Sequence, residues 1–304
     1  MPKEVFGPGY EFMKKDQLLT FDEITEVVHA FVARGVRKVR ITGGEPLLRK
    51  GIEDLIAMLS AIDGVDDLTL TTNASLLERK VAALAEAGLN RVTVSLDAMD
   101  DPTFQTMNDA GFPVQTVLEA IEVASEAGLG PVKVNCVVQR GINDHAVLDM
   151  TRHFRGTPHI VRFIEYMDVG NTNGWRLDDV VPADSMIETI NSEFPLEAVA
   201  PNYPGEVANR FRYKDGEGEV GVIASVTRPF CGSCTRARVS AEGSLYTCLF
   251  ASEGVSLRDT IRSGADLGGA IDDVWAKRED RYSEIRSSRT ARISTPVEMS
   301  YIGG

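Results

Sequence analysis

The chain is poor in cysteine, in positive charge and in long apolar runs, and each shortage excludes a class of protein. Four cysteines in 304 residues are too few for a disulfide framework. The formal net charge of −13 does not favour binding to nucleic acid or to an anionic membrane. No apolar run approaches the roughly 18 residues that span a bilayer, and the N-terminal MPKEVFGPGYEFMKK lacks the apolar stretch of a signal peptide. These features predict a cytoplasmic protein that binds neither nucleic acid nor membrane.

What the chain does contain is the composition of an ordinary globular protein. Hydrophobic residues make up 43% of it and charged residues 25%, as in typical soluble domains. At about 150 residues per domain the length allows one or two domains, although an α/β barrel commonly uses about 200–250 residues in one unit. The sequence is therefore long enough to bury a sizeable core.

A unit of helix, glycine and strand recurs along the first half of the chain. In each copy an apolar helical stretch ends at a glycine, and a β-branched strand begins four residues later. The pairs are Gly35 with Val39, Gly88 with Val92, and Gly128 with Val132. Glycine tolerates the left-handed conformation that closes a helix, and a helix followed closely by a strand, several times over, implies parallel strands with crossover helices. Further helices are predicted to start near residues 21, 52, 76, 115 and 183, the first with a capping box of Thr20 and Glu23, and further strands to cover 68–73 and 160–167.

Polar and apolar side chains alternate along four consecutive predicted strands. Since side chains on a strand alternate between its two faces, the polar residues share one surface. They are Lys38, Arg40, Thr42, Thr69, Thr71, Asn73, Thr93, Ser95, Asp97, Lys133 and Asn135. An open sheet with a solvated face is the alternative, but crossover helices should cover both faces of a parallel sheet. We therefore predict an α/β fold, a partial (β/α) barrel of parallel strands with a polar interior.

The rhythm of the sequence changes near residue 168. Residues 168–185 are loop-rich, turn signals crowd 195–215, and short strands are predicted over 220–225 and 236–250, the latter as a hairpin that turns at Glu242-Gly243. We predict two regions: a barrel over residues 1–168, and a smaller, irregular C-terminal layer over residues 169–304.

Three of the four cysteines lie close together, as Cys231-Gly-Ser-Cys234 followed by Cys248. A structural zinc site requires four nitrogen or sulfur ligands, and no histidine lies between Met167 and the C-terminus. A redox-active CxxC would leave Cys248 unexplained. Three thiolates suit an iron–sulfur cluster whose fourth iron binds an exogenous ligand, with zinc as the open alternative. We interpret Cys136, on the apolar strand face, as a small buried hydrophobe.

Two arginines follow the CxxC directly. In an extended chain Arg236 and Arg238 point the same way, and two guanidinium groups make a fork suited to phosphate. Together with Lys38, Arg40 and Lys133 of the polar strand face, they predict a site for a polyanionic small molecule. The alternative is that each is an exposed charge or is paired with one of the 45 acidic residues.

Several motifs taken together resemble one enzyme family. On its own, GGEP at 43–46 indicates only a tight turn. With its flanks RITGGEPLLR, with TTNA at 71–74, VSLDA at 94–98 and the cysteine pattern with its RxR, the sequence resembles the radical S-adenosylmethionine (SAM) enzymes. Within them it is similar to the family of GTP 3′,8-cyclases of molybdenum cofactor biosynthesis. The resemblance covers essentially the whole chain.

The resemblance implies a set of ligands and a lyase reaction. SAM would be bound by Gly44, Ser95 and Met167, and a [4Fe–4S] cluster, its open iron facing guanine, by Cys231, Cys234 and Cys248. GTP would be bound by Arg40, Thr71, Lys133, Arg236 and Arg238, with Lys38 and Arg162 as weaker members of the set. In the family, a 5′-deoxyadenosyl radical removes the ribose 3′ hydrogen of GTP, and the sugar radical attacks C8 to give 3′,8-cyclo-7,8-dihydroguanosine 5′-triphosphate. No residue of this chain is assigned a catalytic role.

The resemblance also implies partners: a reductant of unknown identity, a possible homodimer, and cyclic pyranopterin monophosphate synthase as the downstream enzyme.

The sequence departs from the family at one point. Radical SAM enzymes carry an N-terminal Cys-x3-Cys-x2-Cys that binds a second [4Fe–4S] cluster, the one that cleaves SAM, whereas this chain has no cysteine before Cys136. We expect the first barrel strand and this cluster to be absent and the printed chain to initiate no radical. A truncated or misplaced start is the favoured cause, and a cluster-less nucleotide-binding paralogue without turnover is the alternative.

Overall fold

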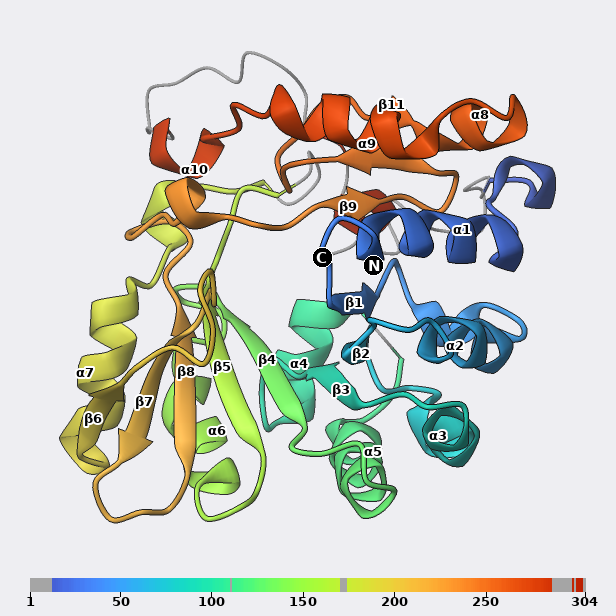
Figure 1. Ribbon diagram of the computed structural model, residues 1–304. Coiled ribbons are helices and arrows are strands. Elements are labelled where there is room, and N and C mark those ends of the chain that lie inside the picture. Colours follow the sequence, from blue (N-terminus) through green and yellow to red (C-terminus); the bar gives the residue numbers. More distant parts are fainter. Residues whose placement is uncertain (1–12, 110, 170–173, 286–296, 298, 303–304) are drawn as a thin grey trace.

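The computed structural model describes residues 13–109, 111–169, 174–285, 297 and 299–302. Its main feature is an eight-stranded sheet in the order β1-β2-β3-β4-β5-β8-β7-β6 (Figure 1). The strands are β1 (Lys38–Ile41), β2 (Asp67–Thr72), β3 (Arg91–Ser95), β4 (Lys133–Val138), β5 (Ile160–Glu165), β6 (Leu196–Val199), β7 (Asn209–Tyr213) and β8 (Glu219–Ile223). β1 to β5 and β8 are parallel, whereas β6 and β7 form an antiparallel hairpin at the edge. The predicted α/β partial barrel is therefore confirmed.

The first helices begin where the sequence predicts. They are α1 (Phe21–Val32), α2 (Ile52–Ser60), α3 (Leu77–Glu86), α5 (Val114–Glu126) and α7 (Ala183–Glu193). The capping box of α1 is formed: the Glu23 amide donates to Thr20 Oγ1 at 3.1 Å, and the Thr20 amide donates to Glu23 Oε2 at 2.8 Å. Gly35, Gly88 and Gly128 have φ of +86°, +96° and +83° just beyond α1, α3 and α5, as expected of glycines that close helices.

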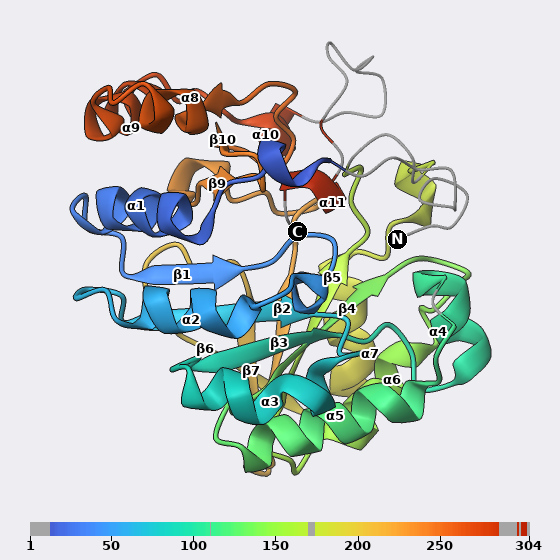
Figure 2. The ribbon, with the colours of Figure 1, turned by 90° about the vertical axis from the view of Figure 1, so that its right-hand side faces the viewer.

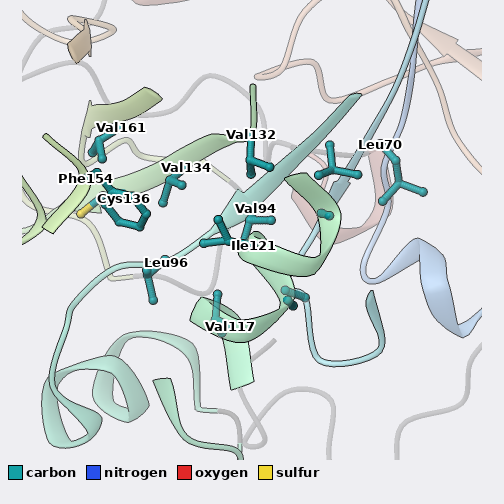
Figure 3. Packing of buried hydrophobic residues seen from close by; sticks show 14 of the residues in the cluster. Leu70, Val94, Leu96, Val117, Ile121, Val132, Val134, Cys136, Phe154 and Val161 are labelled. Atoms are coloured by element: carbon teal, nitrogen blue, oxygen red, sulfur yellow. The ribbon is translucent and has the colours of Figure 1, made fainter. Parts of the chain in front are cut away.

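The barrel core lies between the sheet and its helices. Leu70, Val94, Val134 and Cys136 are completely buried on the outer face of the sheet, and Figure 3 shows Val94 next to Ile121 of α5 and Cys136 next to Phe154 of α6 (Ala146–Phe154). The predicted apolar face, including the buried position of Cys136, is thus confirmed. Because this face is covered by helices, the polar face must line the inside of the barrel.

Four elements of the barrel were not predicted. They are α4 (Asp101–Asn108), α6 (Ala146–Phe154), β6 and β7. The turn signals over 195–215 correspond to a long connection, residues 200–208, between β6 and β7, and hid the short strands on either side of it. The strand predicted over 220–225 is also placed differently: β8 pairs in parallel with β5 within the main sheet and does not belong to a small C-terminal layer.

A second, smaller layer packs against α1. Its antiparallel sheet, β11 (Val255–Ser256), β10 (Ser244–Tyr246) and β9 (Arg238–Val239), includes the hairpin that the sequence predicts. Its helices are α8 (Leu257–Arg262), α9 (Leu267–Ala276), α10 (Tyr282–Ile285) and α11 (Met299–Ile302). Figure 2 shows α8 and α9 lying over α1, where Leu257 and Ile271 share a buried cluster with Val27. The predicted boundary near residue 168 stays a prediction.

Short 3-10 helices, η1 (Lys15–Gln17), η2 (Pro46–Leu48), η3 (Leu177–Asp179) and η4 (Cys231–Ser233), complete the described elements. Among the helices of the described ranges, none is long and apolar enough to cross a membrane.

Candidate active site

Hydrogen bonds across the strands organise the polar face of the barrel. Arg40 Nη1 on β1 donates to Thr71 Oγ1 on β2 at 2.8 Å and to Thr93 Oγ1 on β3 at 3.3 Å. Further along the same face of the sheet, Arg162 Nε on β5 donates to Asn135 Oδ1 on β4 at 2.9 Å. The alternation of polar residues therefore produces one continuous inner surface, as predicted.

Keeping the cations on this surface charged costs free energy, because they are largely removed from water. Burial lowers the pKa of Arg40 below its usual range. Burial, reinforced by neighbouring cations, lowers the pKa of Lys133 to about 8 and that of Arg162 to about 10. Among the described residues, no carboxylate forms an ion pair with any of these three. A bound polyanion would supply the missing negative charge.

A charge cluster lies at the start of the first three strands. Lys38 Nζ is 3.1 Å from Asp67 Oδ2, and Arg91 Nε donates to Asp67 Oδ1 at 3.2 Å. The Tyr203 ring lies over the Lys38 ammonium, with 5.2 Å between Nζ and the ring centroid. Lys38, predicted as a weaker member of the GTP set, is thus already paired.

The 200–208 connection reaches the same surface. A small pocket of about 20 Å³, room for about one water molecule, is lined by Lys133, Arg162, Asn202 and Glu206, among others. The Glu206 carboxylate accepts the Asn202 amide at 2.6 Å, and its charge acts on both cations against the effect of burial on their pKa values. Sequence reasoning missed Tyr203 and Glu206 because they lie in a connection without periodicity.

The residues predicted to bind SAM lie at the carboxyl ends of the parallel strands. Gly44 follows β1, Ser95 ends β3, and Met167 lies two residues beyond β5, so all three are at carboxyl ends of parallel strands, where ligands of open α/β sheets bind. Gly43 has φ of +140°, and nothing lies within 4 Å of the position that a Cβ would occupy. The turn therefore leaves room for a ligand to approach its backbone, which fits SAM.

Glu45 fixes this turn to the next strand. Its Oε1 accepts the Leu47 amide at 3.0 Å and the Thr72 hydroxyl at 2.8 Å, while Oε2 accepts the Asn73 amide at 2.8 Å. The glutamate of GGEP thus joins the end of β1 to the end of β2 and sets the shape of the turn.

A second carboxylate, which the sequence did not reveal, anchors the segment that leads to the CxxC. Glu165 at the end of β5 is completely buried. Its oxygens accept the Ala183 amide at 2.7 Å, the Val226 amide at 2.7 Å, the Thr227 amide at 2.9 Å and the Thr227 hydroxyl at 2.5 Å. The carboxylate therefore holds the first turn of α7 and residues 226–227 against the barrel.

The three neighbouring cysteines lie beyond this anchor, next to arginines. Arg236 donates to Cys234 Sγ from Nε at 3.3 Å and from Nη2 at 3.1 Å, and the Phe250 amide donates to Cys248 Sγ at 3.5 Å. For Cys234, the bonds and charge of Arg236 outweigh burial and lower the pKa, whereas burial raises the pKa of Cys248. A lowered thiol pKa favours the thiolate, the form that binds metal.

The donor set suits an iron–sulfur cluster, and zinc stays the open alternative. Within the described ranges no three His, Cys, Asp or Glu side chains converge closely enough to hold one metal ion. Each thiolate of a [4Fe–4S] cluster binds a different iron, so cluster ligands need not converge on one point. Three half-buried thiols in a cationic setting, Cys231, Cys234 and Cys248, meet that requirement. The N-terminal cluster has no such fit, because residues 1–135 contain no cysteine.

Arg238 connects the barrel to the cysteines. Burial lowers its pKa to about 10, the charge of nearby Arg236 adds to this, the thiols of Cys248 and Cys234 oppose it, and Arg40 on β1 is also within electrostatic range. The predicted cations of the barrel and those next to the CxxC are therefore brought together. Arg236 itself donates a hydrogen bond to Cys234 and lies over the Phe230 ring, 4.9 Å from its guanidinium.

Comparisons with known proteins show the family to which the chain belongs. The chain matches the Radical SAM superfamily over residues 5–154 and the family described as Molybdenum Cofactor Synthesis C over residues 159–284. It is 50% identical to "GTP 3′,8-cyclase" of Acidothermus cellulolyticus and 50% identical to "GTP 3′,8-cyclase" of Xanthomonas axonopodis, in both cases over 100% of this chain and 91% of the relative.

Among solved structures, Streptococcus suis SuiB bound to S-adenosylmethionine aligns with a TM-score of 0.62 at 16% identity, over 93% of this chain and 63% of that one. At such low identity the likeness supports the fold alone.

Proposed function

Because the chain belongs to the GTP 3′,8-cyclase family of radical SAM enzymes, we propose that it binds GTP inside the partial barrel and acts in the conversion of GTP to 3′,8-cyclo-7,8-dihydroguanosine 5′-triphosphate in molybdenum cofactor biosynthesis. One observation supports the substrate most strongly: Arg40, Lys133 and Arg162 are desolvated, no carboxylate of the described residues forms an ion pair with them, and the charge of Glu206 only partly offsets the effect of burial on Lys133 and Arg162. On a chain of net charge −13, such a group of cations suits a triphosphate.

The barrel cations and the cysteine region would hold opposite ends of the nucleotide. Lys133 and Arg162, with Lys38 nearby, would bind the triphosphate by charge-assisted hydrogen bonds. Thr71 and Arg40, already bonded to each other at 2.8 Å, would present a fixed donor pair to the sugar and phosphates. Arg238 would orient the base toward the thiols of Cys231, Cys234 and Cys248, because it is the cation that lies near both groups.

The second ligand, SAM, would bind at the carboxyl ends of the parallel strands. Gly44, Ser95 and Met167 would bind SAM there, with Glu45 fixing the GGEP turn. In this family SAM supplies the radical that takes the ribose 3′ hydrogen. In this proposal the residues named above bind GTP, the C-terminal [4Fe–4S] cluster and SAM. They supply no thiolates for the SAM-cleaving cluster, since none of the first 135 residues is cysteine.

The function is tested by product analysis under anaerobic conditions. With SAM, GTP and a strong reductant, we expect the printed chain to release no 5′-deoxyadenosine, and a version carrying an N-terminal Cys-x3-Cys-x2-Cys segment to form the cyclic nucleotide. Product is identified by mass spectrometry, with ATP in place of GTP as the control.

An extended chain that holds both clusters and SAM but forms no product would contradict the cyclase. If it still binds GTP, the second candidate function, a nucleotide-binding paralogue without turnover, replaces it. Release of 5′-deoxyadenosine by the printed chain would show that other residues replace the missing thiolates.

A further inference from the structure

The segment that follows α9 and includes the first three residues of α10 contacts the chain next to the cysteines. Residues 278–284, here called the clasp, have the sequence REDRYSE. The even-numbered side chains, Arg278, Asp280, Tyr282 and Glu284, each contact the cysteine region, whereas Glu279 and Arg281 between them are exposed. The motif analysis did not single out this segment, and the proposed binding of GTP and SAM does not use it.

The contacts begin at the CxxC. Arg278 Nη1 donates to the carbonyl oxygen of Cys234. The Arg278 guanidinium lies over the Trp275 ring, with 4.9 Å between its central carbon and the ring centroid. At the other end of the clasp, Glu284 Oε1 accepts the amide of Gly232 at 3.0 Å. The two charged side chains therefore hold the backbone of the CxxC from both sides.

The middle of the clasp holds the third cysteine. Asp280 Oδ2 accepts the hydroxyl of Thr247 at 2.5 Å, one residue before Cys248. The Tyr282 ring stacks on Phe250, two residues after Cys248, with 4.6 Å between centroids and 25° between planes. The Cys248 turn is thus fastened on both sides as well.

Tyr282 also reaches the barrel. Its hydroxyl donates to Asp168 Oδ2 at 2.5 Å, and Asp168 is buried next to Met167, beyond the end of β5. A single side chain therefore touches the Cys248 turn and the strand end where SAM is proposed to bind. Partners that fix the orientation of metal ligands commonly govern how tightly the metal is held.

We propose that the clasp is a positioning element that holds the three cysteines in one arrangement and ties this arrangement to the barrel through Tyr282 and Asp168. The proposal rests on the proposed function only in treating the cysteines as cluster ligands. Its geometric part concerns the protein without metal.

The test measures alkylation of each cysteine by iodoacetamide in the full, metal-free chain, with peptide mass spectrometry. Tyr282→Phe removes the bond to Asp168 and leaves the ring. We expect Cys248 and the CxxC cysteines to react roughly tenfold faster, which corresponds to about 1.4 kcal/mol and lies at the scale of a hydrogen bond to a charged group. Cys136, completely buried in the barrel, should stay protected. Tyr213→Phe, at a buried tyrosine on β7 outside the clasp, is the control and should react as the unaltered chain does.

A charged variant separates positioning from simple electrostatics. Arg278 helps to lower the pKa of Cys234, so loss of its charge alone would leave less thiolate and slow the alkylation of that cysteine. Release of the clasp would speed it. We expect Arg278→Met to react faster at Cys234, and Lys277→Met, an exposed neighbour, to be unchanged.

In the cluster-loaded protein, Tyr282→Phe should lose iron to a chelator several-fold faster than Tyr213→Phe. Unchanged alkylation in both clasp variants would overturn the proposal. A rise that includes Cys136 would also overturn it, because it would report global unfolding. Failure of the chain to bind iron would contradict the proposed cluster and leave the alkylation result to decide the clasp.

Discussion

Lys133 should make GTP binding depend on pH. In the ligand-free protein burial is the main cause that brings the pKa of this lysine from 10.5 to about 8, and the positive charges of Arg162, Arg91 and Lys38 contribute. A triphosphate against the ammonium would favour its charged form and raise the pKa again. Binding must then take up a proton at any pH between these two values, and affinity must fall as the pH rises through that window.

The magnitude follows from the size of the shift. If the complex restores the ordinary pKa of 10.5, then raising the pH from 7.5 to 9.5 should weaken binding about 20-fold, with close to one proton taken up per ligand near pH 9. In the ligand-free protein the charge of Lys133 lowers the folding stability, because the lowered pKa means that folding places an ammonium group where it is poorly hydrated. Lys133→Met should therefore stabilise the ligand-free protein by about 1–3 kcal/mol while weakening GTP binding.

Calorimetric titration in buffers of different ionisation enthalpy measures both affinity and proton uptake. Guanine loses a proton of its own in alkaline solution, so tripolyphosphate is titrated in parallel. Lys133→Arg is the control, because arginine stays charged throughout this range and should bind with little dependence on pH. An equal pH dependence in Lys133→Arg, or none for tripolyphosphate with the unaltered chain, would refute the role given to Lys133.

Three further outcomes are expected. Arg238→Ala should weaken GTP binding about 10- to 150-fold with the cluster intact by absorbance, and Arg238→Lys should restore it only in part; unchanged affinity in calorimetry would assign Arg238 to the surface charges. Anaerobic reconstitution should give about four iron and four sulfide per chain, whereas stoichiometric zinc without iron uptake would contradict the cluster. Glu165→Gln, which turns an amide toward amide donors, should lower the free energy of unfolding in urea by about 2–4 kcal/mol, whereas the exposed control Glu193→Gln should leave it nearly unchanged; equal effects would show that the anchor contributes nothing special.

The barrel could be predicted from the sequence because its signals are local and repeated. Gly35, Gly88 and Gly128 each mark a helix end, and the period-two alternation after them assigns each strand a polar and an apolar face. The hairpin of β6 and β7 could not be predicted in this way. Its strands are short, the connection between them is long, and the hairpin joins the main sheet only because β8 pairs with β5, about 60 residues earlier in the sequence.

The candidate site could be predicted from the sequence only where a residue carries a local signal. Arg40 and Lys133 stand out because a cation on an inward strand position is unusual, and the cysteines because their spacing is rare. Glu165 carries no such signal: a glutamate that ends a strand becomes an anchor only when Ala183 and Val226 are brought to it by the fold. The clasp is likewise an ordinary charged segment until it is packed against the cysteines.

The central claim is that the buried cations of the barrel and the cysteine region form a single site for GTP. Calorimetric titration of the cluster-loaded chain at pH 7.5 with GTP, with ATP and with the Arg162→Met variant tests it most directly. We expect one GTP per chain, at least tenfold weaker binding of ATP, and a loss of about 10- to 150-fold in Arg162→Met, the scale of a charged hydrogen bond. Because that variant removes a desolvated charge, it should fold at least as stably as the unaltered chain. Equal affinity for GTP in the variant and the unaltered chain, or no binding by either, would contradict the account.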